Sequence, residues 1–335
     1  MTMFDNKTIL ITGGTGSFGK RFTEIFLRKY PKIKKLIILS RDELKQFVMA
    51  ENLDKKNLEK TRFLLGDVRD KNRLLMALKK VDYVIHAAAL KQVPTAEYNP
   101  FEFIKTNILG AQNLIEACIA NNVKKVIALS TDKAAAPINL YGATKLASDK
   151  LFISANNIIG KNKISFSVVR YGNVLMSRGS VIPKFLENIK LNKTLNLTHP
   201  DMTRFNISLD KSVNFVIQTL INSIGGEIFV PKLPSFRIID LIKCLSIKPK
   251  YKISGIRVGE KLHEEMITSS DSYNTIEGKK FYIILSQGNN EIKKYLKKFK
   301  AKKILKPFSY NSNENSHFLK QNELKKIIQA EIQNK

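Results

Sequence analysis

The 335-residue chain lacks a long apolar run, and no stretch approaches the roughly 18 consecutive apolar residues that a bilayer-spanning helix needs. It also lacks an N-terminal leader pattern, because an apolar run begins within a few residues of Met1. Only two cysteines are present, Cys118 and Cys244, and both fall in predicted helices. We expect two buried free thiols in a reducing compartment rather than a disulfide framework. These absences predict a cytoplasmic protein without a membrane span.

Acidic residues are scarce, with 29 Asp and Glu against 57 Lys and Arg, which gives a net charge of +28. A field of this sign favours anionic ligands such as nucleotides, and nucleic acid must be considered as well. Much of the excess is scattered lysine, dense near the C-terminus, and no aromatic-interleaved binding motif accompanies it. We therefore expect no nucleic-acid partner. The sequence also has no internal repeats.

A glycine-rich segment near the N-terminus organises the rest of the chain. The β-branched run 8–11 leads into Thr12-Gly13-Gly14-Thr15-Gly16-Ser17-Phe18-Gly19, and a helix-like stretch follows. Strand, glycine turn and helix form the context in which such a run binds a dinucleotide. Gly13 permits the tight turn, Gly16 lets the backbone approach a pyrophosphate, and Gly19 lets the helix pack closely. The helix N-terminus then offers N–H groups to the phosphates.

Short apolar strands alternate with amphipathic helices through the first half of the chain, which predicts an α/β fold with a Rossmann-type doubly wound parallel sheet. After about residue 174 the strands become sparse, which predicts a smaller C-terminal substrate-binding lobe. We expect an NADP-binding domain over 1–174 with later segments returning to it, the lobe over 175–286, and a basic extension over 287–335 that ends in a helix. Strands are expected at 8–12, 35–39, 61–65, 83–86, 126–129 and 165–170, and later helices at 213–220, 238–245 and 322–332.

Polar residues follow two of these strands. Ser40-Arg41 lies about 20 residues beyond the last glycine, where an NAD enzyme would place an acid for the ribose hydroxyls. A hydroxyl and a guanidinium suit a 2′-phosphate instead, so NADP is the expected cofactor; the alternative is that Arg41 is a solvated loop residue. Asp67 and Val68 follow the next strand, where they would meet the adenine, although Gly-Asp is also a common turn.

Tyr141-Gly142-Ala143-Thr144-Lys145 carries the strongest chemical signal. At positions i and i+4 of a helix, Tyr141 and Lys145 share one face. A nearby ammonium lowers the pKa of a phenol, so the tyrosinate could act as a base near neutrality. Asp132-Lys133, just after a predicted strand, supplies a further acid–base pair.

Two other motifs carry no site. His263-Glu264-Glu265 lacks the second histidine of a zinc-peptidase motif, and we expect no metal site. No Gly-Lys-Thr/Ser follows the glycine loop, so it is not a P-loop. His86 and His199 are interpreted as structural.

Together these motifs resemble the extended short-chain dehydrogenase/reductase family, over nearly the whole chain. The resemblance is carried by the glycine loop, Gly66-Asp67-Val68, Ala87-Ala88-Ala89, Thr106-Asn107, Ser130-Thr131, Tyr141-x-x-x-Lys145 and Tyr171-Gly172-Asn173. Narrower stretches resemble the nucleotide-sugar 4,6-dehydratases, and among them the group that acts on UDP-N-acetylglucosamine with inversion at C5 for pseudaminic acid or surface-glycan synthesis. These stretches are Ala88-Ala89-Leu90-Lys91-Gln92-Val93-Pro94, Ser130-Thr131-Asp132-Lys133-Ala134 and Arg257-x-Gly259-Glu260-Lys261. Gln92 stands where relatives often have His.

The resemblance implies a homo-oligomer and a full set of site residues. The implied cofactor-binding residues are Gly13, Thr15, Gly16, Ser17, Phe18, Gly19, Ser40, Arg41, Asp67, Val68, Ala87, Ala88, Lys91, Tyr141 and Lys145. The implied substrate-binding residues are Lys91, Asn173, Arg204, Arg257 and Glu260. The implied catalytic residues are Thr131, Asp132, Lys133, Tyr141 and Lys145, while Asn107 is implied to be structural.

The implied reaction oxidises C4, eliminates water across C5 and C6, and returns the hydride to C6. Asp132 is the expected acid for the C6 hydroxyl, and Lys133 assists proton removal from C5 only if its pKa is depressed. Retaining dehydratases carry Asp-Glu at this place and epimerases usually carry small or apolar residues, so Lys133 favours inversion. A C4 epimerase, a retaining dehydratase and an NADP-binding regulator without turnover remain alternatives, although such regulators typically lose the Tyr/Lys pair.

Overall fold

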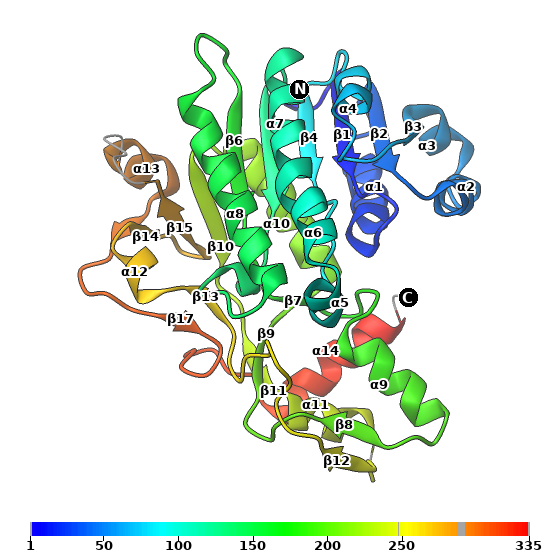
Figure 1. Cartoon of the computed structure of the whole chain (residues 1–335), viewed down its shortest axis with the longest axis vertical. Helices are drawn as coiled ribbons and strands as arrows, with labels where there is room; N and C mark the ends of the chain where they lie inside the picture. The colour runs from blue at the N-terminus through cyan, green and yellow to red at the C-terminus, as the bar shows by residue number, and fades with distance from the viewer. Residues whose placement is uncertain (1, 247, 287–291, 334–335) are drawn as a thin grey trace.

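The computed structural model describes residues 2–246, 248–286 and 292–333, and its centre is a ten-stranded sheet (Figure 1). The strands of this sheet are β1 (Thr8–Thr12), β2 (Lys35–Ser40), β3 (Thr61–Leu65), β4 (Tyr83–His86), β5 (Lys125–Leu129), β6 (Ser165–Val169), β10 (Glu227–Pro231), β14 (Thr275–Glu277), β15 (Phe281–Leu285) and β16 (Lys302–Lys303). Their order is β16-β14-β15-β10-β6-β5-β4-β1-β2-β3. From β3 to β10 the neighbours are parallel, and the order β3-β2-β1-β4-β5-β6 is that of a dinucleotide-binding fold. The predicted doubly wound parallel sheet is confirmed.

Helices cover both faces of the sheet. One face carries α1 (Ser17–Lys29) and α10 (Leu209–Asn222), which contact each other, and the other carries α4 (Lys71–Ala77), α7 (Gly110–Ala120) and α8 (Leu140–Ser154). Because both faces are covered, all five residues of the central strand β1 are buried, including the threonines at its two ends. The remaining helices of this half are short: α2 (Glu43–Glu51), α3 (Lys55–Lys60), α5 (Val93–Tyr98) and α6 (Pro100–Phe103).

A smaller lobe lies below the carboxyl ends of the central strands (Figure 1). It contains β7 (Asn173–Val174), β8 (Leu195–Leu197), β9 (Thr203–Ile207), β11 (Ser235–Arg237), β12 (Tyr251–Ile253), α9 (Val181–Lys190), α11 (Ile238–Leu245) and α14 (Gln321–Gln333). Its core is separate from that of the large sheet and includes Ile182, Phe236, Leu241 and Leu324. The expectation that strands are sparse after residue 174 is wrong. The strands are frequent but only two to five residues long, too short to show an alternating pattern.

The chain crosses between the two parts several times. α10, β10, β14 and β15 lie with the large sheet, as does α13 (Ile292–Phe299), whose Tyr295 is buried in the main core. β17 (Tyr310–Asn311) pairs with β13 (Glu265–Ile267), next to α12 (Ser269–Ser272), and α14 then packs on α11. The predicted start of the basic extension, at Gln287, lies outside the described residues. The boundaries at 174 and 286 therefore remain predictions.

Neither cysteine forms a disulfide. Cys118 is buried in α7, but Cys244 is only half-buried in α11, so the prediction of two buried thiols is wrong for Cys244. Its thiol lies at the lobe surface, 3.4 Å from the Gln321 carbonyl oxygen. Within residues 2–246, 248–286 and 292–333, no helix has the length and apolar character needed to cross a membrane.

Candidate active site

One large cavity of about 1680 Å³ lies between the carboxyl ends of the parallel strands and the small lobe. Every residue predicted to bind cofactor or substrate or to act in catalysis lines it, from Gly13 on the β1 side to Glu260 in the lobe. In open α/β sheets, ligands bind at this end of the strands, where the chain direction switches. The structure thus brings the predicted residues into one site, while their individual roles remain predictions.

The glycine turn has the geometry that a dinucleotide requires. Gly13 has φ +65°, a left-handed conformation that disfavours side chains, and a Cβ there would meet the Ala88 backbone at 2.9 Å. A Cβ on Gly19 would overlap the Gly14 carbonyl group. Gly16 is the N-cap of α1 and makes no side-chain cap bond, so the helix N-terminus faces the cavity with its backbone. These features fit a pyrophosphate at this helix end.

The far end of the nucleotide groove carries exposed charges. Arg41 Nη1 lies 3.5 Å from Asp67 Oδ2, and the same carboxylate accepts from Arg69 Nε at 2.9 Å. The Arg41 side chain is 53% exposed and the Asp67 side chain 22%. Partial burial raises the pKa of Asp67, but Arg69 and Arg41 outweigh it and hold that pKa below its usual value. An ionised acceptor and a solvent-facing guanidinium therefore lie together just beyond the carboxyl ends of β2 and β3.

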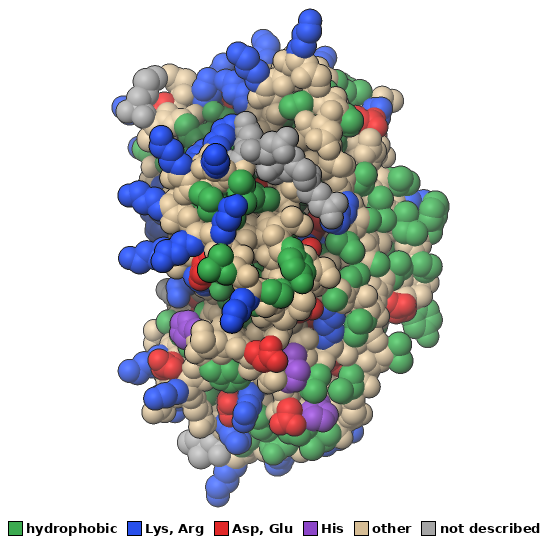
Figure 2. All heavy atoms as spheres, turned by 90° about the vertical axis from the view of Figure 1, so that its left-hand side faces the viewer, with side chains coloured by type: hydrophobic (Ala, Val, Ile, Leu, Met, Phe, Trp, Pro, Cys, Tyr) green, Lys and Arg blue, Asp and Glu red, His purple; other side chains and the backbone are tan. Residues whose placement is uncertain are grey.

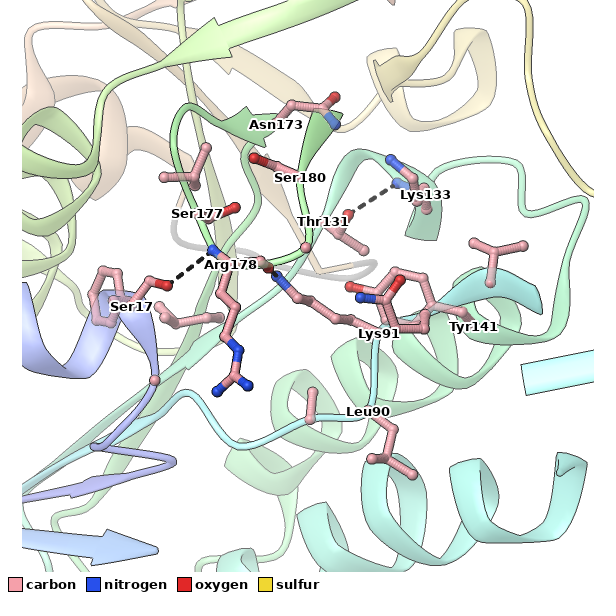
Figure 3. Close-up of a pocket in the computed structure, with 18 of the residues that line it drawn as sticks. Ser17, Leu90, Lys91, Thr131, Lys133, Tyr141, Asn173, Ser177, Arg178 and Ser180 are labelled. Atoms are coloured by element: carbon pink, nitrogen blue, oxygen red, sulfur yellow. Dashed lines mark hydrogen bonds between the residues drawn. The ribbon is translucent and has the colours of Figure 1, made fainter. Parts of the chain in front are cut away.

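A segment of the lobe reaches across the cavity to the glycine turn (Figure 3). We call residues 177–180 the strap. The Arg178 N–H donates to Ser17 Oγ at 3.1 Å, and the Arg178 carbonyl oxygen accepts from Lys91 Nζ at 3.1 Å. Burial lowers the pKa of Lys91, and the charge of Lys133 lowers it further. The sequence analysis did not find Arg178, because nothing in its local sequence indicates that it crosses the cavity.

Tyr141 and Lys145 share a face of α8, as their spacing predicts, and both are buried. The predicted lowering of the Tyr141 pKa towards neutrality is wrong in this structure. Burial raises that pKa to about 12, although the Lys133 charge and a hydrogen bond with Thr131 oppose the shift. The Lys145 ammonium instead donates to the Leu129 carbonyl oxygen at 2.8 Å, and burial lowers the pKa of Lys145. The cation that acts on the phenol is therefore Lys133.

Asp132 and Lys133 form a buried ion pair at the end of β5. Lys133 Nζ lies 3.0 Å from Asp132 Oδ1, and the Thr131 hydroxyl donates to the same oxygen at 2.9 Å. Glu264, which precedes β13, approaches from the lobe and places Oε1 3.0 Å from the same ammonium. Asp132 and Glu264 are 1% and 2% exposed.

The pKa of Lys133 in this cluster differs from the prediction. Burial lowers the pKa of Lys133, but Asp132 and Glu264 outweigh burial, so the pKa lies above its ordinary value. The depressed pKa that would make Lys133 a ready base is therefore wrong for this arrangement. Burial raises the pKa of Asp132 despite the neighbouring ammonium, which suits a carboxylic acid that donates a proton.

Arg204 is committed to the protein rather than aimed at a ligand. Its terminal nitrogens donate to the backbone carbonyl oxygens of Thr203, Lys261 and Leu262, at 2.7 to 3.0 Å. Arg204 therefore fixes the segment that carries Glu260 and Glu264. Its predicted role as a fork for the UDP pyrophosphate has no support in these contacts. Arg257, by contrast, is 56% exposed in its side chain and lines the cavity.

Glu264 is the main residue that the sequence analysis missed. It was considered only as part of a metal motif, and among the described residues no three His, Cys, Asp or Glu side chains are grouped to hold a metal ion. A signal was present, since Glu264 lies only four residues beyond Glu260 in a stretch already expected at the substrate. His86 has the predicted structural position, buried with Nδ1 2.8 Å from the Thr12 hydroxyl. Asn107 likewise bonds both backbone groups of Leu90.

The sheet order, the glycine turn and the Tyr141/Lys145 face of α8 define an extended short-chain dehydrogenase/reductase. A family model described as polysaccharide biosynthesis protein matches residues 9–286, and the chain belongs to this family.

Curated relatives include two activities. A UDP-N-acetylglucosamine 4,6-dehydratase (inverting) of Campylobacter jejuni is 58% identical over 283 residues, covering 84% of each chain. A UDP-glucose 4-epimerase of Rickettsia bellii is 46% identical over 294 residues, covering 86% of this chain and 85% of the relative.

Solved structures agree on the fold. The X-ray structure of Pen from Bacillus thuringiensis superposes with a TM-score of 0.90 at 36% identity and covers 99% of both chains. A dTDP-glucose 4,6-dehydratase of Streptomyces venezuelae has a TM-score of 0.67 at 23% identity, covering 76% of this chain and 86% of its own, and its likeness concerns the fold alone.

Proposed function

We propose that this protein is a nucleotide-sugar 4,6-dehydratase that converts UDP-N-acetylglucosamine to the 4-keto-6-deoxy-L-arabino sugar, with inversion at C5 and with NADP as cofactor. The observation that carries the proposal is the buried Asp132–Lys133 pair beside Tyr141. C4 oxidation needs a single proton acceptor, whereas elimination across C5 and C6 needs an additional base and acid. The 58% identity to an inverting dehydratase supports the same activity.

The residues divide the reaction between them. Tyr141 is the acceptor of the C4 hydroxyl proton and must act in its ionised form, although its pKa is raised to about 12 in this structure, and Thr131 hydrogen-bonds the phenol. The new C4 ketone acidifies the C5 hydrogen, which the Asp132–Lys133 pair removes. Asp132 then protonates the departing C6 hydroxyl as water. Bound NADP supplies the hydride acceptor and later the donor, so the reaction is redox-neutral overall.

NADP is proposed from the nucleotide end of the cavity. Arg41 and Ser40 line the cavity at the end of β2, and a hydroxyl and a guanidinium there suit a 2′-phosphate. Arg41 has one contact of 3.5 Å with Asp67, which a phosphate could replace. The glycine turn fits the pyrophosphate. Retention of the cofactor through purification is expected, because each turnover returns the hydride.

The substrate nucleotide is proposed to lie against the lobe. Asn173 on β7, Arg257 and Glu260 line that part of the cavity, together with Lys91 at its mouth. Arg204 supports these residues through the backbone contacts described above. A guanidinium such as that of Arg257 suits a pyrophosphate, because its fork binds two oxygens.

Proton NMR of the reaction in deuterated water tests the proposal. The expected product from UDP-N-acetylglucosamine has lost the C6 hydroxyl, has L-arabino configuration and carries one solvent deuteron at C5. A D-xylo product would mean that the enzyme retains configuration. Recovery of a C4 epimer with its C6 oxygen intact would establish the epimerase alternative, which the Rickettsia relative represents.

We propose a homo-oligomer as well. Hydrophobic side chains gather on the edge of the molecule that carries α6, α7 and α8 (Figure 2). Tyr98, at the end of α5, and Phe101, in α6, are 90% and 59% exposed. Large exposed apolar patches mark interaction sites. Size-exclusion chromatography with light scattering measures the molar mass of the assembly, and the mass of a monomer at micromolar concentration would contradict the proposal.

A further inference from the structure

Glu264 is a buried carboxylate for which the proposed reaction has no assigned part. Its backbone is held from both sides by Ser312: the Glu264 N–H donates to Ser312 Oγ at 2.9 Å, and the Ser312 N–H donates to the Glu264 carbonyl oxygen at 2.8 Å. Ser312 is fully buried and also contacts the Thr203 hydroxyl at 2.7 Å. The carboxylate therefore projects from a fixed backbone.

The Glu264 side chain is aimed at the acid–base pair. Oε1 lies 3.0 Å from Lys133 Nζ and 3.6 Å from Arg204 Nε. Oε2 is buried and has no hydrogen-bond partner among the described residues, and the same is true of Asp132 Oδ2. One ammonium thus bridges two carboxylates, each with an oxygen left over, inside the cavity where the sugar is proposed to react.

We propose that Glu264 is the positioning residue of the acid–base pair: it fixes the Lys133 ammonium against Asp132 and retains a proton on that pair. This inference rests on the proposed dehydratase function. Without Glu264, Lys133 would have a single anionic partner and a freely rotating end. With it, loss of the Lys133 proton to solvent would leave two buried anions beside a neutral amine, which is costly in a desolvated site.

A proton retained on the pair can move within it. Transfer from Lys133 Nζ to Asp132 Oδ1 breaks one N–H bond and forms one O–H bond across 3.0 Å, with no change in net charge. The products are an amine, which can take the C5 proton, and a carboxylic acid, which can protonate the leaving C6 hydroxyl. Elimination of water then restores the ammonium and the carboxylate.

The charges around Glu264 agree with its proposed role in positioning Lys133. Lys133, Arg204 and Lys261 face it as cations. Asp132 is the second anion of the cluster. Burial raises the pKa of Glu264, but the three cations outweigh burial and keep that pKa below its ordinary value. The Glu264 charge in turn raises the pKa values of both Asp132 and Lys133.

The test compares Glu264→Gln with Glu265→Gln. Glu265 is the next residue, and its substitution by Gln removes the same charge. The Glu265 carboxylate accepts from Ser309 Oγ at 2.7 Å, away from the Asp132–Lys133 pair. The pH dependence of kcat for UDP-N-acetylglucosamine dehydration is measured for both variants and the wild type. In Glu264→Gln we expect kcat to fall at least tenfold, with KM changed less. We also expect the alkaline limb of the kcat profile, where the Asp132–Lys133 pair loses its proton, to move about one pH unit or more to lower pH. Glu265→Gln should keep the wild-type limb.

A conservative variant separates charge from packing. Glu264→Asp keeps the anion, so its limb should stay near that of the wild type even if kcat falls. If the alkaline limb of the kcat profile of Glu264→Gln lies at the same pH as that of the wild type, the inference is overturned, however much kcat itself has fallen. If Glu264→Gln does not fold, Ser312→Ala replaces it in the test, because it removes the hydroxyl that holds the Glu264 backbone. Ser312→Ala should move the alkaline limb in the same direction by a smaller amount, and an unmoved limb would equally overturn the inference. A wild-type protein that forms no dehydrated product contradicts the proposed function instead, so the two failures are distinct.

Discussion

The two ends of the cavity both pair cations with carboxylates, but in different surroundings. At the nucleotide end, Arg41 and Asp67 are 3.5 Å apart and their side chains are 53% and 22% exposed. At the reaction end, Lys133 and Asp132 are 3.0 Å apart and 22% and 1% exposed. Solvated pairs contribute about 0–1 kcal/mol and rearrange easily, which suits the proposed exchange of Asp67 for a phosphate at Arg41. Buried pairs hold protonation states away from their ordinary values, which suits proton transfer.

Tyr141→Phe should give the largest effect, at the reaction end. Without the phenol, no group accepts the C4 hydroxyl proton, so turnover should fall about 10²–10⁴-fold, while UDP binding measured by calorimetry stays within a few-fold. Tyr83→Phe is the control, since Tyr83 lies at the opposite end of β4 and its hydroxyl makes one long contact, 3.4 Å to the Met3 carbonyl oxygen. Near-normal turnover in Tyr141→Phe would remove this residue from the mechanism.

Lys133→Met should uncouple the two halves of the reaction. C4 oxidation depends on Lys133 only through the Tyr141 pKa, whereas elimination uses the pair directly, so oxidation should slow less than elimination. Single-turnover absorbance should then show reduced nicotinamide that persists, while dehydration falls at least about a hundredfold. The variant also removes the cation that Asp132 and Glu264 share, which should cost about 3–5 kcal/mol of the free energy of unfolding in urea.

A matched surface pair provides the comparison for that loss of stability. Lys232 lies 2.5 Å from Glu277 with side chains 31% and 44% exposed, so Lys232→Met should cost less than about 1 kcal/mol. Equal losses for the two lysine variants would mean that burial does not distinguish the two kinds of pair.

Arg41→Asp should act at the nucleotide end only. Loss of a charge-assisted contact to a 2′-phosphate should weaken NADP about 10–100-fold and NAD much less, as measured by fluorescence titration of the stripped protein. Arg69→Ala is the control, because Arg69 pairs with Asp67 as well but does not line the cavity. Preference for NAD in the unmodified protein would contradict the interpretation of Ser40 and Arg41.

His86→Asn should have the smallest effect, on stability alone. Burial lowers the pKa of His86 to about 3, with a further contribution from Lys145, whereas an unfolded chain protonates near 6.5. The unfolded state therefore binds more protons between these values. The stability that His86 contributes is complete above pH 6.5 and is lost as pH falls towards 3, by about 2 kcal/mol at pH 5. Urea unfolding at pH 7.5 and 5.0 should show a smaller pH difference in the variant, whose amide keeps a partner for Thr12. An unchanged difference would mean that His86 does not titrate in this way.

The same contrast explains how much could be predicted from sequence. The nucleotide end follows from local patterns, since β1, the glycine turn and α1 are contiguous in the chain and each is indicated by its own short stretch of sequence. The reaction end was predicted only in part. Tyr141, Asp132 and Lys133 follow from motifs, but the pKa shifts of Asp132 and Lys133 depend in part on Glu264, which lies more than a hundred residues further along the chain. The strap, which crosses the cavity through backbone contacts of Arg178, leaves no local pattern at all.

The core of the small lobe is completed by α14, the last helix among the described residues. Leu324 and Ile328 of α14 are buried against the lobe, where α14 packs on α11. Chains emerge from the ribosome N-terminus first, and domains generally fold as they emerge. The strands of the nucleotide end are complete by β6, while the lobe must wait for residues beyond 320. A nascent chain would thus acquire a dinucleotide site well before it has an enclosed chamber for chemistry, and a stop codon just ahead of α14 would release a protein competent for the first and not the second.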